Sequence, residues 1–335
     1  MTPLEVAARH AAHEPEPRAM IPLSRDPSRS QLVEAGSERG WRRGLAALSV
    51  RLLARLSRAQ AARRGAEVLL SPPRRPLTQR EREVFASARR DWVPFAGQQF
   101  PLWIWEGASY RPPTVLLIHD WGGRAADLAA FVAPLRREGA RVLAFDAPAH
   151  GEASGNQTDV VEFAATLAFL LRRHSEWAPP RGVVAHGFGA LAATLAVAAG
   201  APAERLVYLA AAESFAPYLE SFRRETGIDE ALLESVRHCV ERRLGRTLES
   251  LRGARLACNL DRPLLAFHDA DDLELPCEHS RMLVDRWTGA RFVRTFGLGH
   301  RGLLHPGAIV AAAVEHLVGE SREPAASAGA IDAGG

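Results

Sequence analysis

The stretch that decides the fold is residues 182–198, GVVAHGFGALAATLAVA. A short β-branched run leads into a glycine-rich turn, and an alanine-rich segment with high helix propensity follows. This order predicts a buried strand, a tight turn and a helix, which is the unit that builds parallel sheets. Two kinds of turn fit: the phosphate-binding loop of dinucleotide-binding proteins, and the sharp G-x-S-x-G turn that presents a nucleophile.

The dinucleotide interpretation rests on residues 187–192, GFGALA, which match G-x-G-x-x-A. Such a loop normally follows the first strand of its unit, with an acidic residue about 20 positions later at the end of the next strand. Here at least four strand-like segments precede the turn. Glu204 lies before the next predicted strand and Glu213 lies beyond it. The position therefore argues against a dinucleotide loop, and we expect no cofactor.

The same alternation of strand and helix runs through most of the chain from Trp92 onward. Strand-like runs occupy residues 100–107, 114–119, 141–146, 182–187, 205–211, 263–270 and 291–297. Helical patterns fill most of the gaps, at about 124–137, 157–174, 188–199, 278–287 and 306–318. Continuous apolar strands separated by amphipathic helices predict an α/β protein with a mostly parallel, doubly wound sheet.

One gap between predicted strands is too long for a single crossover helix. Residues 213–261 look helical throughout. An insertion at this point would lie over the carboxyl ends of the strands, where such sheets bind ligands. We therefore expect a helical cap at about 213–261.

The ends of the chain differ from this core. Residues 1–38 mix Pro, Glu, Arg and Ser without periodicity, and the tail at 320–335 is similar, so both are expected to be disordered. Residues 39–76 are expected to form an amphipathic helix and a linker, SPPRRP. One stripe of this helix holds Leu45, Leu48, Leu52 and Leu56, beside Arg51, Arg55 and Arg58. We expect the leucines to dock on the protein's own core, with contact to a membrane surface as the alternative.

Composition sets limits on function. The chain has 335 residues, 47% of them apolar, and a net charge of only +3. Residues 1–90 hold 18 Arg against 9 acidic residues, but no nucleic-acid-binding motif accompanies them, so no nucleic-acid partner is expected. The three cysteines, Cys239, Cys258 and Cys277, suggest neither a disulfide framework nor a zinc site. This cysteine usage fits a reducing cytoplasm best. Neither a signal peptide nor an apolar window of about 18 residues is visible.

Four segments together carry a resemblance to a known family. They are IHDWGGRAADLAAFVAPLRREGARVLAFDAPAHGEASG at 118–155, VVAHGFGA at 183–190, HDADDLELP at 268–276 and GLGHRGLLHP at 297–306. In this order, the chain resembles the α/β-hydrolase fold, specifically a bacterial group of capped hydrolase-like proteins, over about residues 40–319. The resemblance implies a hydrolase core at 77–319 that carries the cap, with ester-type hydrolysis as the family's activity.

The resemblance also implies roles for individual residues. It places the catalytic acid at Asp272, with Asp269 and Asp271 as rivals, and the general base at His300. The order of turn, acid and histidine is the order of the family. Such a histidine needs a carboxylate that holds its tautomer and stabilises its protonated form.

Two positions depart from the family pattern. The family has serine at the centre of the turn, whereas this chain has Gly187, which has no side chain to attack a carbonyl. His186 is not expected to replace it, because neighbouring side chains at such a turn point to different sides. The family usually has glycine after the strand-end histidine, but here Asp120 follows His119.

The departure at Asp120 bears on the oxyanion site, which the resemblance assigns to the backbone N–H groups of Trp121 and Phe188. A carboxylate that points inward would oppose negative charge developing on a substrate oxygen. One that points outward would be harmless, and the sequence leaves both directions open. His119 and His150 lie at strand ends and are expected to be structural. His305 lacks metal-ligand spacing with His300 and a third residue, so no metal site is expected.

Three functions remain open. The first is a non-catalytic or very weakly active protein that binds a small apolar or ester-like ligand under the cap. The second is a hydrolase in which His300 and Asp272 activate water without an acyl-enzyme, a general-base effect of about 10² to 10⁴-fold. The third is a membrane-surface or protein-docking factor that acts through the helix at 40–70.

Overall fold

The computed structural model describes residues 37–176 and 179–319. The segments predicted to be disordered, 1–38 and 320–335, lie outside the described residues except for Ser37 and Glu38, which begin a helix. None of the helices in these two ranges combines the length and the apolar character needed to cross a bilayer.

The centre of the molecule is an eight-stranded sheet in the order β1-β2-β4-β3-β5-β6-β7-β8. The strands are β1 Arg89–Phe95, β2 Gln98–Trp105, β3 Thr114–Ile118, β4 Arg141–Phe145, β5 Gly182–His186, β6 Arg205–Leu209, β7 Leu264–Asp269 and β8 Ala290–Thr295. Strand β2 pairs antiparallel with β1 on one side and with β4 on the other. All the remaining neighbours, from β4 to β8 in the sheet order, pair parallel. The predicted α/β architecture with a mostly parallel sheet is confirmed.

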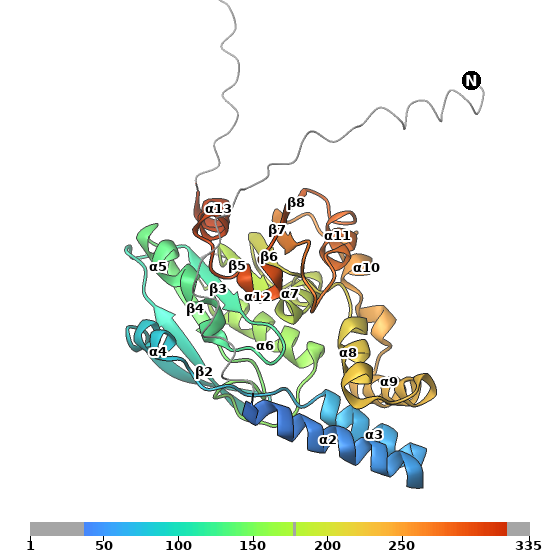
Figure 1. Ribbon diagram of the computed structural model, residues 1–335. Helices are drawn as coiled ribbons and strands as arrows, with labels where there is room; N and C mark the ends of the chain where they lie inside the picture. The colour runs from blue at the N-terminus through green and yellow to red at the C-terminus, as the bar shows by residue number, and fades with distance from the viewer. Residues whose placement is uncertain (1–36, 177–178, 320–335) are drawn as a thin grey trace, which may run out of the picture.

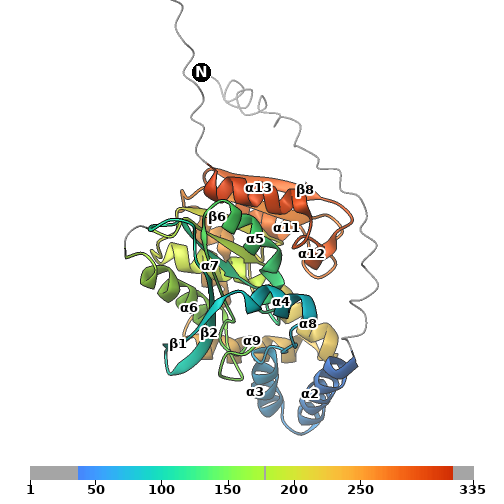
Figure 2. The same ribbon diagram turned by 90° about the vertical axis from the view of Figure 1, so that its left-hand side faces the viewer.

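Helices cover both faces of this sheet, as the apolar strands predict (Figures 1 and 2). Along β3, Leu116 packs into the core on one face while Val115 and Leu117 pack on the other. One face is covered by α4 Gln79–Ala86, α5 Ala129–Arg137 and α13 Gly307–Val318, and the other by α6 Val160–Arg173, α7 Phe188–Ala198 and α11 Glu278–Val284. Alternate residues of a strand point to opposite faces, so a strand covered on both sides must be apolar throughout.

The N-terminal helical region consists of two helices, not of the one helix that we predicted. Helix α2 spans Ser37–Leu56 and α3 spans Arg58–Leu69, and the two lie side by side (Figure 1). Ser57 between them has extended backbone angles, and its hydroxyl accepts a hydrogen bond from the backbone N–H of Gln60 at 3.4 Å. Serine is a favoured N-cap, and this cap ends one helix and starts the next.

The leucine stripe of α2 does not dock on the core, which corrects our expectation. The exposed fractions of its members are 56% for Leu45, 41% for Leu48, 49% for Leu52 and 83% for Leu56. Instead, Ala47 and Val50 are buried. With 3.6 residues per turn, Ala47 and Val50 lie on the face opposite the leucines. The helix therefore packs through Ala47, Val50 and the half-buried Leu53, and it leaves the four leucines of the stripe exposed.

The long segment between β6 and β7 folds into helices. They are α8 Ala216–Thr226, α9 Glu230–Leu244, the short η4 Leu248–Leu251 and α10 Gly253–Ala257. Figure 1 shows α8 and α9 grouped with α2 and α3 at one end of the molecule. Asp229 joins the two pairs: it caps α9 through Leu232 N–H at 2.8 Å and pairs with Arg58 of α3 at 2.6 Å. The description of this segment as a cap domain stays a prediction.

Candidate active site

The glycine-rich turn places Gly187 between β5 and α7. Its backbone angles are φ 53° and ψ −116°, in a region that side chains disfavour at a cost of about 1 to 3 kcal/mol. Glycine adopts such angles without that cost. The backbone thus has the sharp strand-to-helix bend expected of a nucleophile turn, with no side chain at its apex.

The carboxylate of Asp120 points inward, which answers the question that the sequence left open. Asp120 follows β3 and is only 6% exposed. Its Oδ1 accepts hydrogen bonds from the backbone N–H of Phe188 at 2.6 Å and from the hydroxyl of Tyr218 at 3.1 Å. The first donor starts helix α7, and the second comes from α8.

Asp120 fills the space of the missing side chain at position 187. A β-carbon added to Gly187 would overlap Oδ1 and Cγ of Asp120 and would lie 3.0 Å from its Cβ. The two departures from the family pattern are therefore sterically linked. A carboxylate from the neighbouring strand stands where the serine side chain would stand.

The imidazole of His300 lies between two carboxylates. Its Nδ1 is 2.7 Å from Oδ2 of Asp272, and its Nε2 is 3.2 Å from Oδ2 of Asp120. Asp272 is held in turn by the backbone N–H groups of Glu274 and Leu275, each 2.9 Å from its Oδ1. These three side chains form a chain of two hydrogen bonds, which we call the ion triad: Asp120, His300 and Asp272.

The two rival aspartates bond elsewhere. Asp269 accepts hydrogen bonds from the Thr295 hydroxyl and from the backbone N–H groups of Leu298 and Gly299. Asp271 accepts one from the backbone N–H of Gly297 at 2.8 Å. Both carboxylates thus hold the loop that carries His300, whereas Asp272 contacts the imidazole itself.

Electrostatics keep the ion triad charged at neutral pH. Burial disfavours the charged form of His300, but its hydrogen bonds to Asp120 and Asp272 outweigh that effect and raise its pKa to about 10. Burial likewise acts to raise the pKa of Asp120 and of Asp272. For Asp120 the hydrogen bond from His300 more than offsets this effect, and for Asp272 the hydrogen bonds from His268 and His300 do so. Both pKa values therefore lie well below their usual range. His300 is therefore an imidazolium between two carboxylates and holds the proton that a general base would have to accept.

His186 adds a third ionisable group that the sequence analysis set aside. Its ring lies against that of His300, with centroids 4.6 Å apart, and burial lowers its pKa to about 4. Its Nδ1 is buried and has no hydrogen-bond partner among the described residues. Ligand atoms of His186, His300 and Asp120 lie within 4.8 Å of one another, a group that could hold a metal ion. A metal there would have to displace the Nε2 proton of His300.

Two further histidines fix the loop around Asp120. His119 Nε2 accepts from the backbone N–H of Ala147 at 3.0 Å, and His150 Nε2 accepts from that of Gly122 at 2.9 Å. Burial lowers the pKa of both. These contacts hold backbone turns in place, in keeping with the structural role that we expected.

In the predicted oxyanion site, a side chain of the protein itself already accepts a hydrogen bond from one of the two donors. The backbone N–H of Phe188, one of its two predicted donors, is already bonded to Asp120. The other donor was assigned to Trp121, whose ring packs edge-on against that of Phe188 with centroids 5.0 Å apart. A substrate carbonyl would meet a carboxylate at the position where it needs a hydrogen-bond donor.

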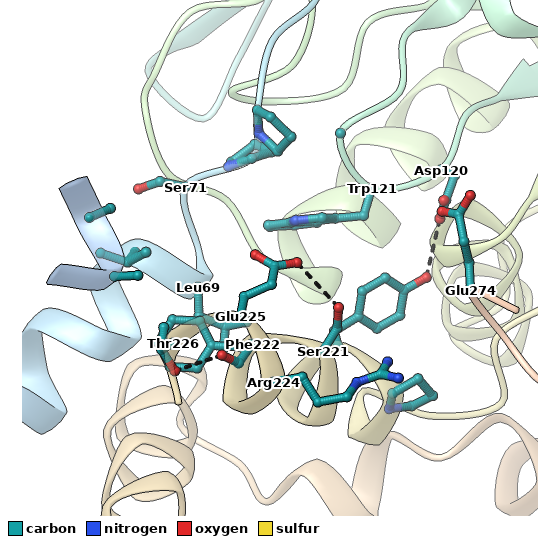
Figure 3. Close-up of a pocket in the computed structure, with 18 of the residues that line it drawn as sticks. Leu69, Ser71, Asp120, Trp121, Ser221, Phe222, Arg224, Glu225, Thr226 and Glu274 are labelled. Carbon is teal, nitrogen blue, oxygen red and sulfur yellow. Dashed lines mark hydrogen bonds between the residues drawn. The ribbon is translucent and has the colours of Figure 1, made fainter. Parts of the chain in front are cut away.

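A cavity of about 1490 Å³ opens above the ion triad. Its walls come from α2, α3, α8 and the loops after β3 and β7 (Figure 3). Figure 3 shows Trp121 and Asp120 on one side of this space and Phe222 and Arg224 on the α8 side. The lining mixes aromatic with charged side chains. The small apolar or ester-like ligand stays a prediction.

Comparisons with known proteins agree with the fold. A family model described as "Alpha/beta hydrolase family" matches residues 115–313. An esterase of Pyrococcus furiosus is 17% identical, with a TM-score of 0.55 over 73% of this chain and 98% of that one. An esterase from Rhodococcus sp. is 16% identical, with a TM-score of 0.53 over 70% of this chain and 99% of that one.

A serine hydrolase from Cycloclasticus zankles is 14% identical, with a TM-score of 0.53 over 70% of this chain and all 100% of that one. At these identities the likeness concerns the fold alone. No curated protein sequence matches the chain significantly.

Proposed function

The chain belongs to the alpha/beta hydrolase family, and from this premise we propose that it binds a small ligand in the cavity above Asp120 without hydrolysing esters by a serine-type mechanism. The ligand enters where a hydrolase of this fold holds its substrate. The protein binds the ligand in this cavity but forms no acyl-enzyme at residue 187.

One observation carries the proposal: the carboxylate of Asp120 stands in place of the nucleophile side chain and accepts the Phe188 N–H. Removal of one oxyanion donor typically costs 10² to 10³-fold in rate. Here the donor is engaged and a negative charge lies beside it. An ester carbonyl therefore meets neither a serine nor a free donor at this position.

The alternative of water activation by His300 is less well supported. A general base must be unprotonated at the working pH. His300 is held as an imidazolium by two carboxylates, and its pKa is raised to about 10. At neutral pH the free site therefore lacks the base that this alternative requires.

Turnover and binding measurements test the proposal. The purified protein is expected to hydrolyse p-nitrophenyl butyrate no faster than its His300→Ala variant, and a fluorophosphonate should label no residue. Anilinonaphthalene sulfonate is expected to fluoresce on binding the cavity, and Ser221→Trp, which narrows it, should weaken binding. Glu138→Trp, an exposed position outside the cavity, serves as the matched control. Ester turnover with a burst, or equal binding by both tryptophan variants, would refute the proposal.

A second candidate function rests on the exposed face of α2. We propose that Leu45, Leu48, Leu52 and Leu56, with the exposed Arg51 and Arg55 beside them, contact the surface of an anionic membrane. Amphipathic helices with leucine on one face and arginine on the flank bind such surfaces by apolar burial and charge attraction. Ala47, on the opposite face of the same helix, lines the cavity, so the leucine face points away from it.

A further inference from the structure

We propose that a groove between α6 and α7 binds a free alkyl carboxylate, a molecule with one unbranched apolar chain and one carboxylate head, such as a fatty-acid anion. The groove is separate from the cavity above Asp120, because the two share no lining residue. The proposal therefore goes beyond the small ligand assigned to that cavity and does not depend on it.

The space in the groove comes from small side chains. Helices α6 and α7 pack side by side on one face of the sheet (Figure 2). The groove has a volume of about 700 Å³, and much of its lining is alanine: Ala164, Ala165, Ala168, Ala196 and Ala199. A molecule in this space therefore lies against apolar atoms of both helices.

Four larger apolar side chains that line the groove are only partly buried. They are Val161 and Phe169 of α6, Leu195 of α7 and Phe95, the last residue of β1. Phe95 stacks on Phe169 with ring centroids 4.7 Å apart, so the hairpin of β1 and β2 reaches the groove. Removal of such apolar surface from water is favourable, which favours an apolar occupant.

The shape of the groove suits a linear chain. The α6 residues that line it recur at one-turn spacing from Val161 to Arg172, a distance of about 16 Å along a helix axis. Residues at this spacing lie on one face of a helix. An extended alkyl chain can contact each turn of this face in succession.

The charge of the groove indicates the head group. Arg172 and Arg173 in the last turn of α6 line it, together with Arg246 after α9, and none of the described lining residues is acidic. Arg172 donates to the Ala199 carbonyl at 3.3 Å. Arg173 and Arg246 have no hydrogen-bond or ion-pair partner within the part of the chain that the structure describes. Guanidinium groups bind carboxylates through two parallel hydrogen bonds, so these arginines favour a carboxylate at the α6 end of the chain.

Calorimetric titration of the full chain with laurate, below its micelle concentration, tests the assignment. One laurate per chain should bind. Affinity should rise from octanoate through decanoate to laurate, by at most about fourfold per added methylene. Dodecyltrimethylammonium has an apolar chain of the same length but a cationic head, and it should bind more weakly. Equal binding of the anion and the cation would overturn the inference.

Ala165→Trp tests the place of the apolar chain. The new ring fills the groove from an exposed position, so laurate binding should be lost while the fold, checked by urea unfolding, is kept. Ala311→Trp is the matched control, because Ala311 is an exposed alanine on α13, outside the groove and on the other face of the sheet. This control should bind laurate as the wild type does.

A charge reversal tests the place of the head group. Arg172→Glu combined with Arg173→Glu should weaken laurate binding by about tenfold or more and strengthen binding of dodecyltrimethylammonium. Arg136→Glu combined with Arg137→Glu makes the same charge change in the last turn of α5, outside the groove. That control should keep the preference of the wild type for laurate, and a loss of the preference in both double variants would contradict the assignment.

The cavity above Asp120 is the competing place for laurate. Ser221→Trp, which narrows that cavity, should leave laurate binding unchanged. If Ser221→Trp removes laurate binding and Ala165→Trp does not, laurate binds in the cavity, so this inference fails and the cavity proposal stands. If laurate does not bind and Ala165→Trp instead turns a dimeric wild type into monomers, the groove is an interface between two copies of the chain and the inference is wrong. Because anilinonaphthalene sulfonate is also an apolar anion, the same two variants assign it to one site or the other.

Discussion

The side chain of Asp120 occupies the volume that a side chain on Gly187 would need. The two residues follow β3 and β5, which are neighbours in the sheet although β4 lies between them in the chain. A β-carbon on Gly187 would overlap the Asp120 carboxylate. A side chain at position 187 therefore requires Asp120 to move or to be replaced, so restoring the family pattern takes changes at both positions.

The first prediction concerns restoration of the serine. Gly187→Ser alone should give no esterase activity and should lower the free energy of unfolding by about 1 to 3 kcal/mol, because the new side chain collides with Asp120 at a strained backbone position. Asp120→Gly combined with Gly187→Ser should remove the collision and free the Phe188 N–H. We expect this double variant to hydrolyse p-nitrophenyl butyrate.

Two controls accompany the double variant. Asp120→Gly alone should be inactive on the ester, and His300→Ala added to the double variant should abolish its activity. Urea unfolding measures the stability of each protein. If the Gly187→Ser variant alone were as active and as stable as the double variant, the two positions would not be coupled in the way the structure indicates.

The second prediction concerns the dependence of stability on pH. The pKa of His300 is raised to about 10 in the folded protein, compared with about 6.5 for an unperturbed histidine. Its contribution to stability should therefore be fully present below about pH 6.5 and should disappear as the pH rises through about 10. Urea unfolding across this window should show a decline in the wild type that is absent in His300→Gln.

The imidazole resonance of His300 gives an independent readout of this effect. In Asp120→Asn the histidine loses one of its two carboxylate partners, so its pKa should fall and the decline in stability should move to lower pH. An unchanged His300 titration in that variant would show that Asp120 does not hold the proton.

Much of the site could be predicted from the sequence because its parts follow local patterns. The run of small and β-branched residues before Gly187 predicted strand, turn and helix. The resemblance to the hydrolase family implied His300 and Asp272, which lie 2.7 Å apart. The direction of the Asp120 side chain could not be predicted, since it depends on β3 lying beside β5. The cluster with His186 was missed because it forms only when the loop after β8 folds over the turn.

The same limit applies to the N-terminal helices. Periodicity located the leucine stripe of α2 but could not tell which face of the helix would pack. The buried face consists of smaller side chains such as Ala47 and Val50, which carry a weaker hydrophobic signal than the exposed leucines. A hydrophobic stripe predicts that one face of a helix is buried in a contact. Only the tertiary structure shows whether that contact is made within the chain.

The third prediction concerns Gly65, where α3 crosses α9. A β-carbon at Gly65 would lie 2.6 Å from Cγ2 of Val236 and 3.5 Å from the ring of Phe222. Gly65→Leu should therefore push the N-terminal helices away from α9 and lower the free energy of unfolding by about 1 to 3 kcal/mol. Gly307→Ala, at a helical glycine with open space around it, should cost nothing measurable in the same urea titration.

Phe222 of α8 also lines the cavity, so the Gly65→Leu variant should bind anilinonaphthalene sulfonate differently from the wild type. Shortening the opposing side chain by Val236→Ala in the same protein should recover part of the lost stability. No recovery would indicate that the close approach of α3 to α9 is not what the leucine disturbs.

The fourth prediction tests the exposed face of α2 with vesicles. Full-length protein should sediment with vesicles that contain anionic lipid and should remain in the supernatant with purely zwitterionic ones, and salt should weaken binding because surface charges are screened. Leu48→Asp combined with Leu52→Asp should abolish sedimentation without destabilising the fold, since both side chains are more than one-third exposed, at 41% and 49%. Arg136→Asp, an exposed arginine on α5, is the charge-matched control and should still bind.

Equal sedimentation of the leucine variant and the control would mean that the leucine face of α2 does not bind the vesicles and contacts a different partner. A size-exclusion profile in which only the leucine variant elutes later would identify that partner as a second copy of the chain.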